Sequence, residues 1–275
     1  MGFHIVKSAL TIMIPMLFAA TGGLFPALAG TLNIALEGML LAGAFVSLTV
    51  YYFTGSVVAA ITGAIIATVI LCLLHSFAAF RMRANIFICG LAINLLSGAL
   101  CVVFSDKLFS TKGVVTVTDI ALPGLTDYYL ILAVFLLITA YVVINKTPFG
   151  YRLRSCGKTD EVLISLGINP VFYKFNAMLI SAVFCGIGGS FLSLNLGSYV
   201  PNMSAGKGWI ALVLIFLGGH KPFGIFIAAF IFGLAESFSN HAQGIWRLPA
   251  DLIFAFPYIC ALLAMIIWRK RNISY

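Results

Sequence analysis

Long apolar stretches, separated by shorter polar ones, run along almost the whole of this chain. Most reach the roughly 20 residues that a helix needs to cross a bilayer, and they hold few charges. The short alternating segments typical of a membrane β-barrel are not seen. The pattern therefore predicts an all-α, polytopic transmembrane bundle of about eight to ten spans. The candidate spans are residues 8–25, 34–53, 56–80, 86–105, 128–145, 175–197, 208–219, 223–240 and 249–268.

Two regions depart from this regular pattern. Pro26 and Gly30 precede the second span, as expected where a helix starts after a break. The stretch 208–219 is too short to cross about 30 Å as a helix that rises about 1.5 Å per residue. We therefore expect broken or re-entrant backbone near residues 22–34 and 205–222, covered by protein or water at that depth.

Composition also indicates a membrane protein. The chain is 62% hydrophobic and 9% charged, whereas about a quarter of the residues in a soluble domain are charged. Its six cysteines include no C-x-x-C pair, so we expect buried small side chains rather than a disulfide framework or a metal site. The first apolar stretch continues past Ala20 without a convincing basic segment before it, which favours a retained span over a signal peptide.

The net charge of +8 is better explained by the membrane than by nucleic acid, because lysine and arginine gather on the cytoplasmic side. The basic residues 268–271 should be cytoplasmic. Counting spans back from them places residues 220–221, 147–174 and 81–83 on the same side. Residues 106–127, with few bases, fall outside, and nine spans would leave the N-terminus outside as well.

The stretch 147–174 is one of the two longest polar interruptions in the chain. Within it, Val162, Leu163 and Leu166 recur at helical spacing, which predicts a short amphipathic helix in residues 159–168.

Basic side chains precede this predicted helix, at Arg152, Arg154 and Lys158. They would give the stretch affinity for an acidic partner surface. Orientation of the chain by the positive-inside bias explains them equally well.

Glu37 is the most unusual charge within a span, because buried ionisable groups are costly in a membrane. It follows Asn33 by four residues, which would place both on one helical face. The pair either caps and braces the broken helix or contacts a substrate on its path. Asn94 and Asn195 are further amides that could line such a path.

No catalytic constellation is visible in the sequence. Residues 204–208, Ser-Ala-Gly-Lys-Gly, resemble a phosphate-binding loop, but proline occupies position 201 and Gly208 follows Lys207. The required pattern, G-x-x-x-x-G-K-[ST], is therefore not met. We predict that the chain is not an enzyme and that any energy from ATP comes from another subunit.

Four collinear blocks resemble the permease subunits of bacterial ABC importers for ribose, branched-chain amino acids and nucleosides. They are residues 31–45, 147–194, 205–237 and 248–266. The blocks after residue 204 are most similar to the shorter permease of nucleoside-type systems, whose relatives include riboflavin importers. Asn33, Glu37 and Gly38 match the N-x-x-x-E-G element of the family.

This resemblance implies a single transmembrane permease domain, residues 1–275, in the inner membrane of a bacterium. It implies a second homologous permease, a cytoplasmic ATPase that binds ATP and Mg²⁺, and an extracytoplasmic substrate-binding lipoprotein, with no cofactor held by this chain. The cytoplasmic loop 147–174 would present a coupling helix, residues 159–167, to the ATPase. The coupling residues are expected to be Arg154, Gly157, Lys158, Thr159, Asp160, Glu161, Leu163 and Gly167.

The substrate implied by the resemblance is nucleoside-like, either riboflavin or a purine nucleoside. A simple sugar is the alternative within the same family. A stand-alone transporter driven by an ion gradient is the alternative from a different class, and paired intramembrane charges would mark it.

Overall fold

The computed structural model describes residues 2–117 and 124–243 of the chain, almost entirely as helices. Within them, seven helices are long and apolar enough to cross a membrane, which confirms the predicted all-α polytopic bundle. In chain order the elements are α1 (Gly2–Leu28), α2 (Leu36–Thr54), α3 (Val57–Ser76), the π-helical turn η1 (Phe77–Arg81), α4 (Ile86–Phe109), β1 (Val115–Thr116), α5 (Leu125–Lys146), α6 (Pro148–Cys156), α7 (Asp160–Ser165), α8 (Pro170–Leu196), β2 (Ser198–Tyr199), α9 (Lys207–Leu217) and α10 (Pro222–Gln243).

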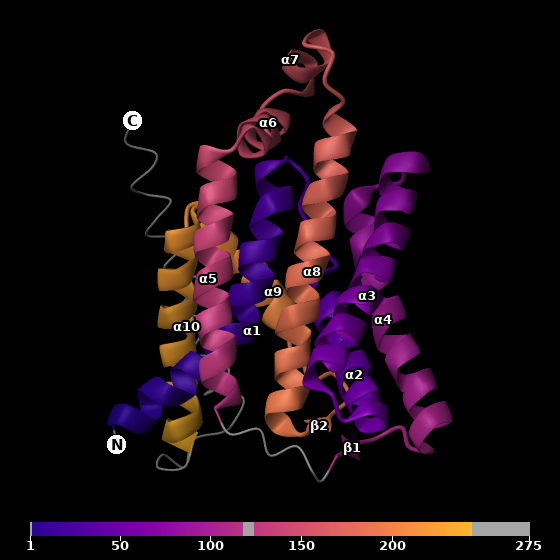
Figure 1. Ribbon diagram of the computed structural model, residues 1–275, viewed down its shortest axis with the longest axis vertical. Helices are drawn as coiled ribbons and strands as arrows, with labels where there is room; N and C mark the ends of the chain where they lie inside the picture. The colour runs from indigo at the N-terminus through magenta and orange to yellow at the C-terminus, as the bar shows by residue number, and fades with distance from the viewer. Residues whose placement is uncertain (1, 118–123, 244–275) are drawn as a thin grey trace.

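Successive crossings alternate in direction along a bundle with two distinct ends (Figure 1). The short helices α6 and α7 form one end, and the two-stranded ribbon of β1 and β2 lies at the other. The N-terminus lies at the ribbon end, with α10 antiparallel to α1 beside it. There the Ser237 hydroxyl donates a hydrogen bond to the Ile5 carbonyl at 2.9 Å. The predicted span 249–268 and the basic residues 268–271 are outside the described residues.

Two of the crossings are only partly helical. After α1 ends at Leu28, residues 29–35 continue without a helix, and α2 begins at Leu36. Residues 201–206 likewise form turns before the short helix α9. The break predicted near residues 205–222 is therefore present, in the form of a partly helical crossing, because α9 leads onward to the end of the bundle where α10 begins (Figure 1). The first break falls in the later part of the predicted window 22–34, since Pro26 is tolerated inside α1.

Small residues let three helices approach closely at the centre of the bundle. A Cβ atom on Gly189 of α8 would lie 2.5 Å from the Leu40 carbonyl oxygen of α2. One on Gly186 would lie 2.8 Å from the Cα atom of Ile65 in α3. Helices in a membrane associate largely through such close packing, because lipid supplies no hydrophobic driving force between them. The small residues thus fix α8 against α2 and α3.

Candidate functional site

The N-terminal ends of α2 and α9 meet inside the bundle, although they are far apart in the sequence. Glu37, in the first turn of α2, accepts two backbone hydrogen bonds from the start of α9. Gly206 N–H donates to Oε1 at 2.8 Å, and Gly208 N–H donates to Oε2 at 2.7 Å. A Cβ atom on Gly208 would overlap the backbone nitrogen of Glu37, so glycine is required there for steric reasons.

These contacts explain why residues 204–208 resemble a phosphate-binding loop. The free N–H groups and the positive end of the dipole at a helix N-terminus favour an anion. Here that anion is the carboxylate of Glu37. The sequence identified Glu37 but not its partners, because backbone N–H groups have no side-chain signature. The glycines on either side of Lys207 were the available signal.

Asn94 of α4 bridges the break before α2. Its Oδ1 atom accepts a hydrogen bond from Gly38 N–H at 2.7 Å, and its Nδ2 atom donates to the Ile34 carbonyl at 2.9 Å. The N-cap residue of α2 is Ala35, which has no side-chain acceptor, so Asn94 supplies the cap from a neighbouring helix. It lies about 12 Å into α4, at about 1.5 Å per residue from Ile86.

Asn33 lies in the non-helical segment before α2. Its Oδ1 atom accepts a hydrogen bond from Ala35 N–H at 3.1 Å, and its Nδ2 atom donates to Ser181 Oγ of α8 at 3.0 Å. The expectation that Asn33 and Glu37 share a helical face is wrong, because α2 starts only at Leu36. We call Asn33, Glu37, Asn94, Ser181 and the Gly206 and Gly208 N–H groups the polar node. The node joins α2, α4, α8 and α9.

Asn195 is not part of the polar node. It is exposed near the C-terminal end of α8, where its Oδ1 atom accepts a hydrogen bond from Thr126 Oγ1 at 3.2 Å. The structure thus brings Asn33, Glu37 and Asn94 together and separates Asn195 from them by several turns of α8.

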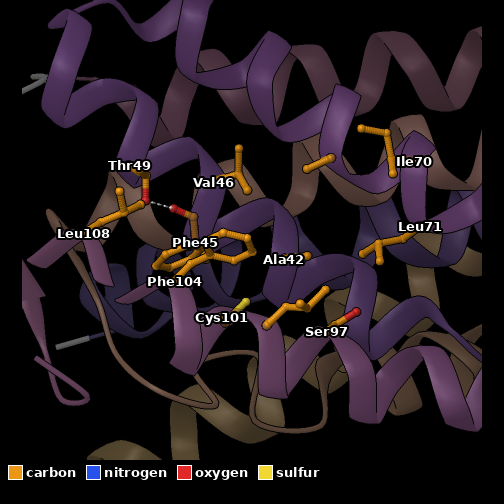
Figure 2. A pocket seen from close by; sticks show the side chains of 12 residues that line it. Ala42, Phe45, Val46, Thr49, Ile70, Leu71, Ser97, Cys101, Phe104 and Leu108 are labelled. Atoms are coloured by element: carbon orange, nitrogen blue, oxygen red, sulfur yellow. Dashed lines mark hydrogen bonds between the residues drawn. The ribbon is translucent and has the colours of Figure 1, made fainter. Parts of the chain in front are cut away.

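A cavity of about 450 Å³ lies between α2, α3 and α4 (Figure 2). Its wall is mainly aliphatic and aromatic, with Phe45 and Phe104 side by side in the view. The hydroxyl of Thr49 donates to the Phe45 carbonyl at 2.9 Å, and that of Ser97 donates to the Ile93 carbonyl at 2.7 Å. Because these donors are satisfied by helix backbone, the wall offers little for a polar substrate to bind.

The helices α6 and α7 build the projecting end of the bundle. Thr147 caps α6 by accepting a hydrogen bond from Gly150 N–H at 3.3 Å. In α7, only Leu163 is buried, with 2% of its surface exposed. The side chains around it are 56% (Val162), 61% (Ile164) and 68% (Leu166) exposed. The short helix predicted in residues 159–168 is present, but it ends at Ser165 and buries Leu163 alone, so Val162 and Leu166 are exposed.

Polar contacts hold the loop in shape. The Lys174 ammonium of α8 lies 2.6 Å from Asp160 Oδ2 at the start of α7. The guanidinium of Arg154 lies over the Tyr151 ring, 5.1 Å from its centroid. Burial raises the pKa of the Cys156 thiol, with a smaller rise from Asp160, and Cys156 Sγ lies 3.9 Å from the Pro170 carbonyl oxygen. The other predicted coupling side chains, all exposed, are those of Lys158, Thr159 and Glu161.

The two predicted coupling glycines serve different purposes. Gly167 has a φ of +72° and ends α7, with its N–H donating to the Ile164 carbonyl at 2.9 Å. Gly157 instead lies against the end of α1, where an added Cβ would overlap the Leu28 carbonyl oxygen. Nothing in the sequence signalled this contact between the loop and α1.

Comparison with known proteins assigns this architecture to a family. Residues 5–266 match the family described as "Branched-chain amino acid transport system / permease component". The chain belongs to this permease family. The predicted ABC importer permease of the cytoplasmic membrane is thereby confirmed, and such permeases have no ATPase site of their own.

Two relatives match this permease over nearly their whole length. NupQ of Bacillus subtilis, a guanosine ABC transporter permease, is 31% identical, covering 95% of this chain and 90% of NupQ. NupC of Lactococcus lactis, a nucleoside ABC transporter permease, is 28% identical, covering 98% of this chain and 93% of NupC. PsaBC of Streptococcus pneumoniae, solved in complex with a Fab, has the same fold, with a TM-score of 0.59 at 12% identity over 95% of this chain and 91% of the solved one.

Proposed function

We propose that this permease forms part of the pore of an ATP-driven importer of purine nucleosides. The observation that carries the proposal is the match, over at least 95% of this chain, to NupC and NupQ, which are named for nucleoside and guanosine transport. Riboflavin, which also joins a flat ring to a polyol, is the second candidate substrate within the resemblance described above. A simple sugar is the third.

The loop 147–174 is proposed as the docking site of the ATPase. It projects beyond the helices at one end of the bundle (Figure 1). Val162, Ile164 and Leu166 each expose an apolar side chain on this projection. Apolar side chains grouped on a solvated surface commonly mark a protein contact. The basic residues Arg154 and Lys158 beside them would complement an acidic rim of the motor.

The same end of the bundle is proposed to face the cytoplasm. Arg81 at the end of η1, Arg83 in the following turn and Lys221 before α10 lie at this end, together with the basic loop. This distribution agrees with the positive-inside bias. The N-terminus then lies on the outer side, as the span count predicted.

The energy and the substrate are proposed to reach this chain through partners. ATP and Mg²⁺ would bind to the ATPase, since the loop that resembles a phosphate site here binds the Glu37 carboxylate. A second homologous permease would complete the pore, and an extracytoplasmic lipoprotein would deliver the substrate.

Uptake by the reconstituted complex tests this function. Proteoliposomes holding both permeases and the ATPase, supplied with the lipoprotein, should accumulate guanosine or adenosine only when ATP is present. Riboflavin and ribose are the comparison substrates, and preferential uptake of either would replace the nucleoside assignment. Full uptake by this chain alone without ATP would instead support an ion-coupled transporter.

Reversing the charge of the loop should weaken docking without disturbing the fold. In the double variant Arg154→Glu/Lys158→Glu, we expect ATP-driven uptake to fall about tenfold, because two favourable long-range charge interactions become repulsive. The amount of permease in the membrane should not change, since Lys158 is exposed and Arg154 lies over the ring of Tyr151, which is itself exposed. Lys112→Glu, at the opposite end, is the matched control. Uptake equal to that of the control would refute an electrostatic contribution to docking.

A further inference from the structure

The docking loop touches the break between α1 and α2 through backbone atoms. A Cβ atom on Gly157 would overlap the Leu28 carbonyl oxygen and would lie 3.2 Å from the Gly30 nitrogen. A Cβ atom on Gly30 would in turn lie 3.1 Å from the Cα of Gly157. The φ of Gly157 is −72°, which any residue can adopt, so glycine is required there by the contact and not by the backbone conformation.

The non-helical segment 29–35 leads from this contact into the polar node. Gly30 lies against the loop, while Asn33 is bonded to Ser181 and the Ile34 carbonyl to Asn94. The first residues of the segment, 29–31, still bond back to the end of α1, but residues 32–34 have no helical hydrogen bonds, and such backbone changes its dihedrals at lower cost than a helix does. It can therefore follow a shift of the loop while the helices around it remain rigid.

The node connects this segment to α9. Each oxygen of the Glu37 carboxylate holds one N–H group at the start of α9, and Gly208 lets the two helix ends touch. A displacement of the first turn of α2 would accordingly move α9 as well. The loop, the break and both partly helical crossings are thus connected by an unbroken series of backbone and polar contacts.

We propose that Gly157 is a positioning residue that transmits movement of the docking loop to the polar node through Leu28 and Gly30. The proposal rests on the proposed docking of the ATPase at this loop. It assigns Gly157 a role toward the pore and not toward the motor, which α7 is proposed to contact. Two arrangements of the node, one for each nucleotide state, would then be selected by the motor.

Hydrogen exchange on the assembled complex tests the proposal. The complex of both permeases and the ATPase is measured without nucleotide and after trapping with ATP and vanadate. The readouts are the exchange rates of peptides covering 160–167, 29–35 and 200–208, together with uptake. The variant is Gly157→Ala. The control is Gly113→Ala, whose added methyl would meet only Thr111 Oγ1 at an ordinary 3.6 Å.

We expect trapping to change exchange in all three peptides of the unaltered complex and of Gly113→Ala. In Gly157→Ala the change in 160–167 should persist, while the changes in 29–35 and 200–208, and ATP-driven uptake, are lost. Persistence of all three changes in Gly157→Ala would overturn the proposal. The proposal would also be overturned if, in the unaltered complex, trapping changed exchange in 200–208 but not in 29–35. This second test does not depend on the folding of a variant. No response of 160–167 in that complex would instead overturn docking at the loop, and this proposal with it.

Discussion

Glu37→Ala is expected to lower both the thermal stability of the permease and its transport activity. The substitution leaves the N–H groups of Gly206 and Gly208 without their acceptor inside the bundle. Both hydrogen bonds are partly buried, and a buried donor left without an acceptor costs up to about 1–3 kcal/mol. Among the described residues, these two are the hydrogen bonds that join α2 to the start of α9, and the substitution removes both. Thermal unfolding in detergent and uptake in proteoliposomes measure the two effects.

A graded series separates the hydrogen bonds from the volume of the side chain. Glu37→Gln keeps the shape but turns one acceptor into an NH₂ group that faces an N–H donor, so we expect an intermediate loss of stability. Asp106→Ala serves as the control. The Asp106 carboxylate is half exposed, and its ion pair with the exposed Lys112, 3.8 Å away, contributes little to stability. Unaltered yield, stability and uptake in Glu37→Ala would exclude Glu37 from any role at this site.

Leu163→Pro is expected to uncouple ATP hydrolysis from uptake while the chain still inserts into the membrane. Leu163 is the single buried side chain of α7, and proline would remove both this anchor and the backbone N–H of the residue. Proline inside a helix costs about 3 kcal/mol. A six-residue helix cannot absorb that cost, so the exposed residues around Leu163 would lose their arrangement.

Two neighbours of Leu163 make the experiment specific. Ile164→Ser removes an exposed apolar side chain and leaves α7 its anchor, so a fall in ATPase recovery would indicate direct contact with the motor. Ser165→Ala is the control, because its hydroxyl bonds only to the Val162 carbonyl of its own helix. Uptake by Leu163→Pro at the level of Ser165→Ala would show that α7 does not carry the coupling.

The hydrophobic pattern located the spans well because a helix in lipid must be apolar along its whole length. Seven of the nine candidate spans correspond to long helices, and the stretch 208–219 was correctly recognised as too short. The pattern placed boundaries less well. It placed the start of the span 175–197 near residue 175, whereas the corresponding helix α8 starts at Pro170, where Asn169 caps it. The helix α6 was missed because it is short, lies outside the apolar spans and mixes polar with apolar residues.

The sequence by itself determined the class of protein, the two broken crossings, and Glu37 and Asn94 as unusual residues within spans. It could do so because an ionisable or amide group is costly in lipid and therefore conspicuous there. Only the tertiary structure decided what these groups bind. The Glu37 carboxylate holds backbone N–H groups of residues 206 and 208, Asn94 caps a helix other than its own, and Gly157 lies against the end of α1. Backbone donors and close backbone contacts are common to every sequence, so only the packing of the helices shows which of them meet.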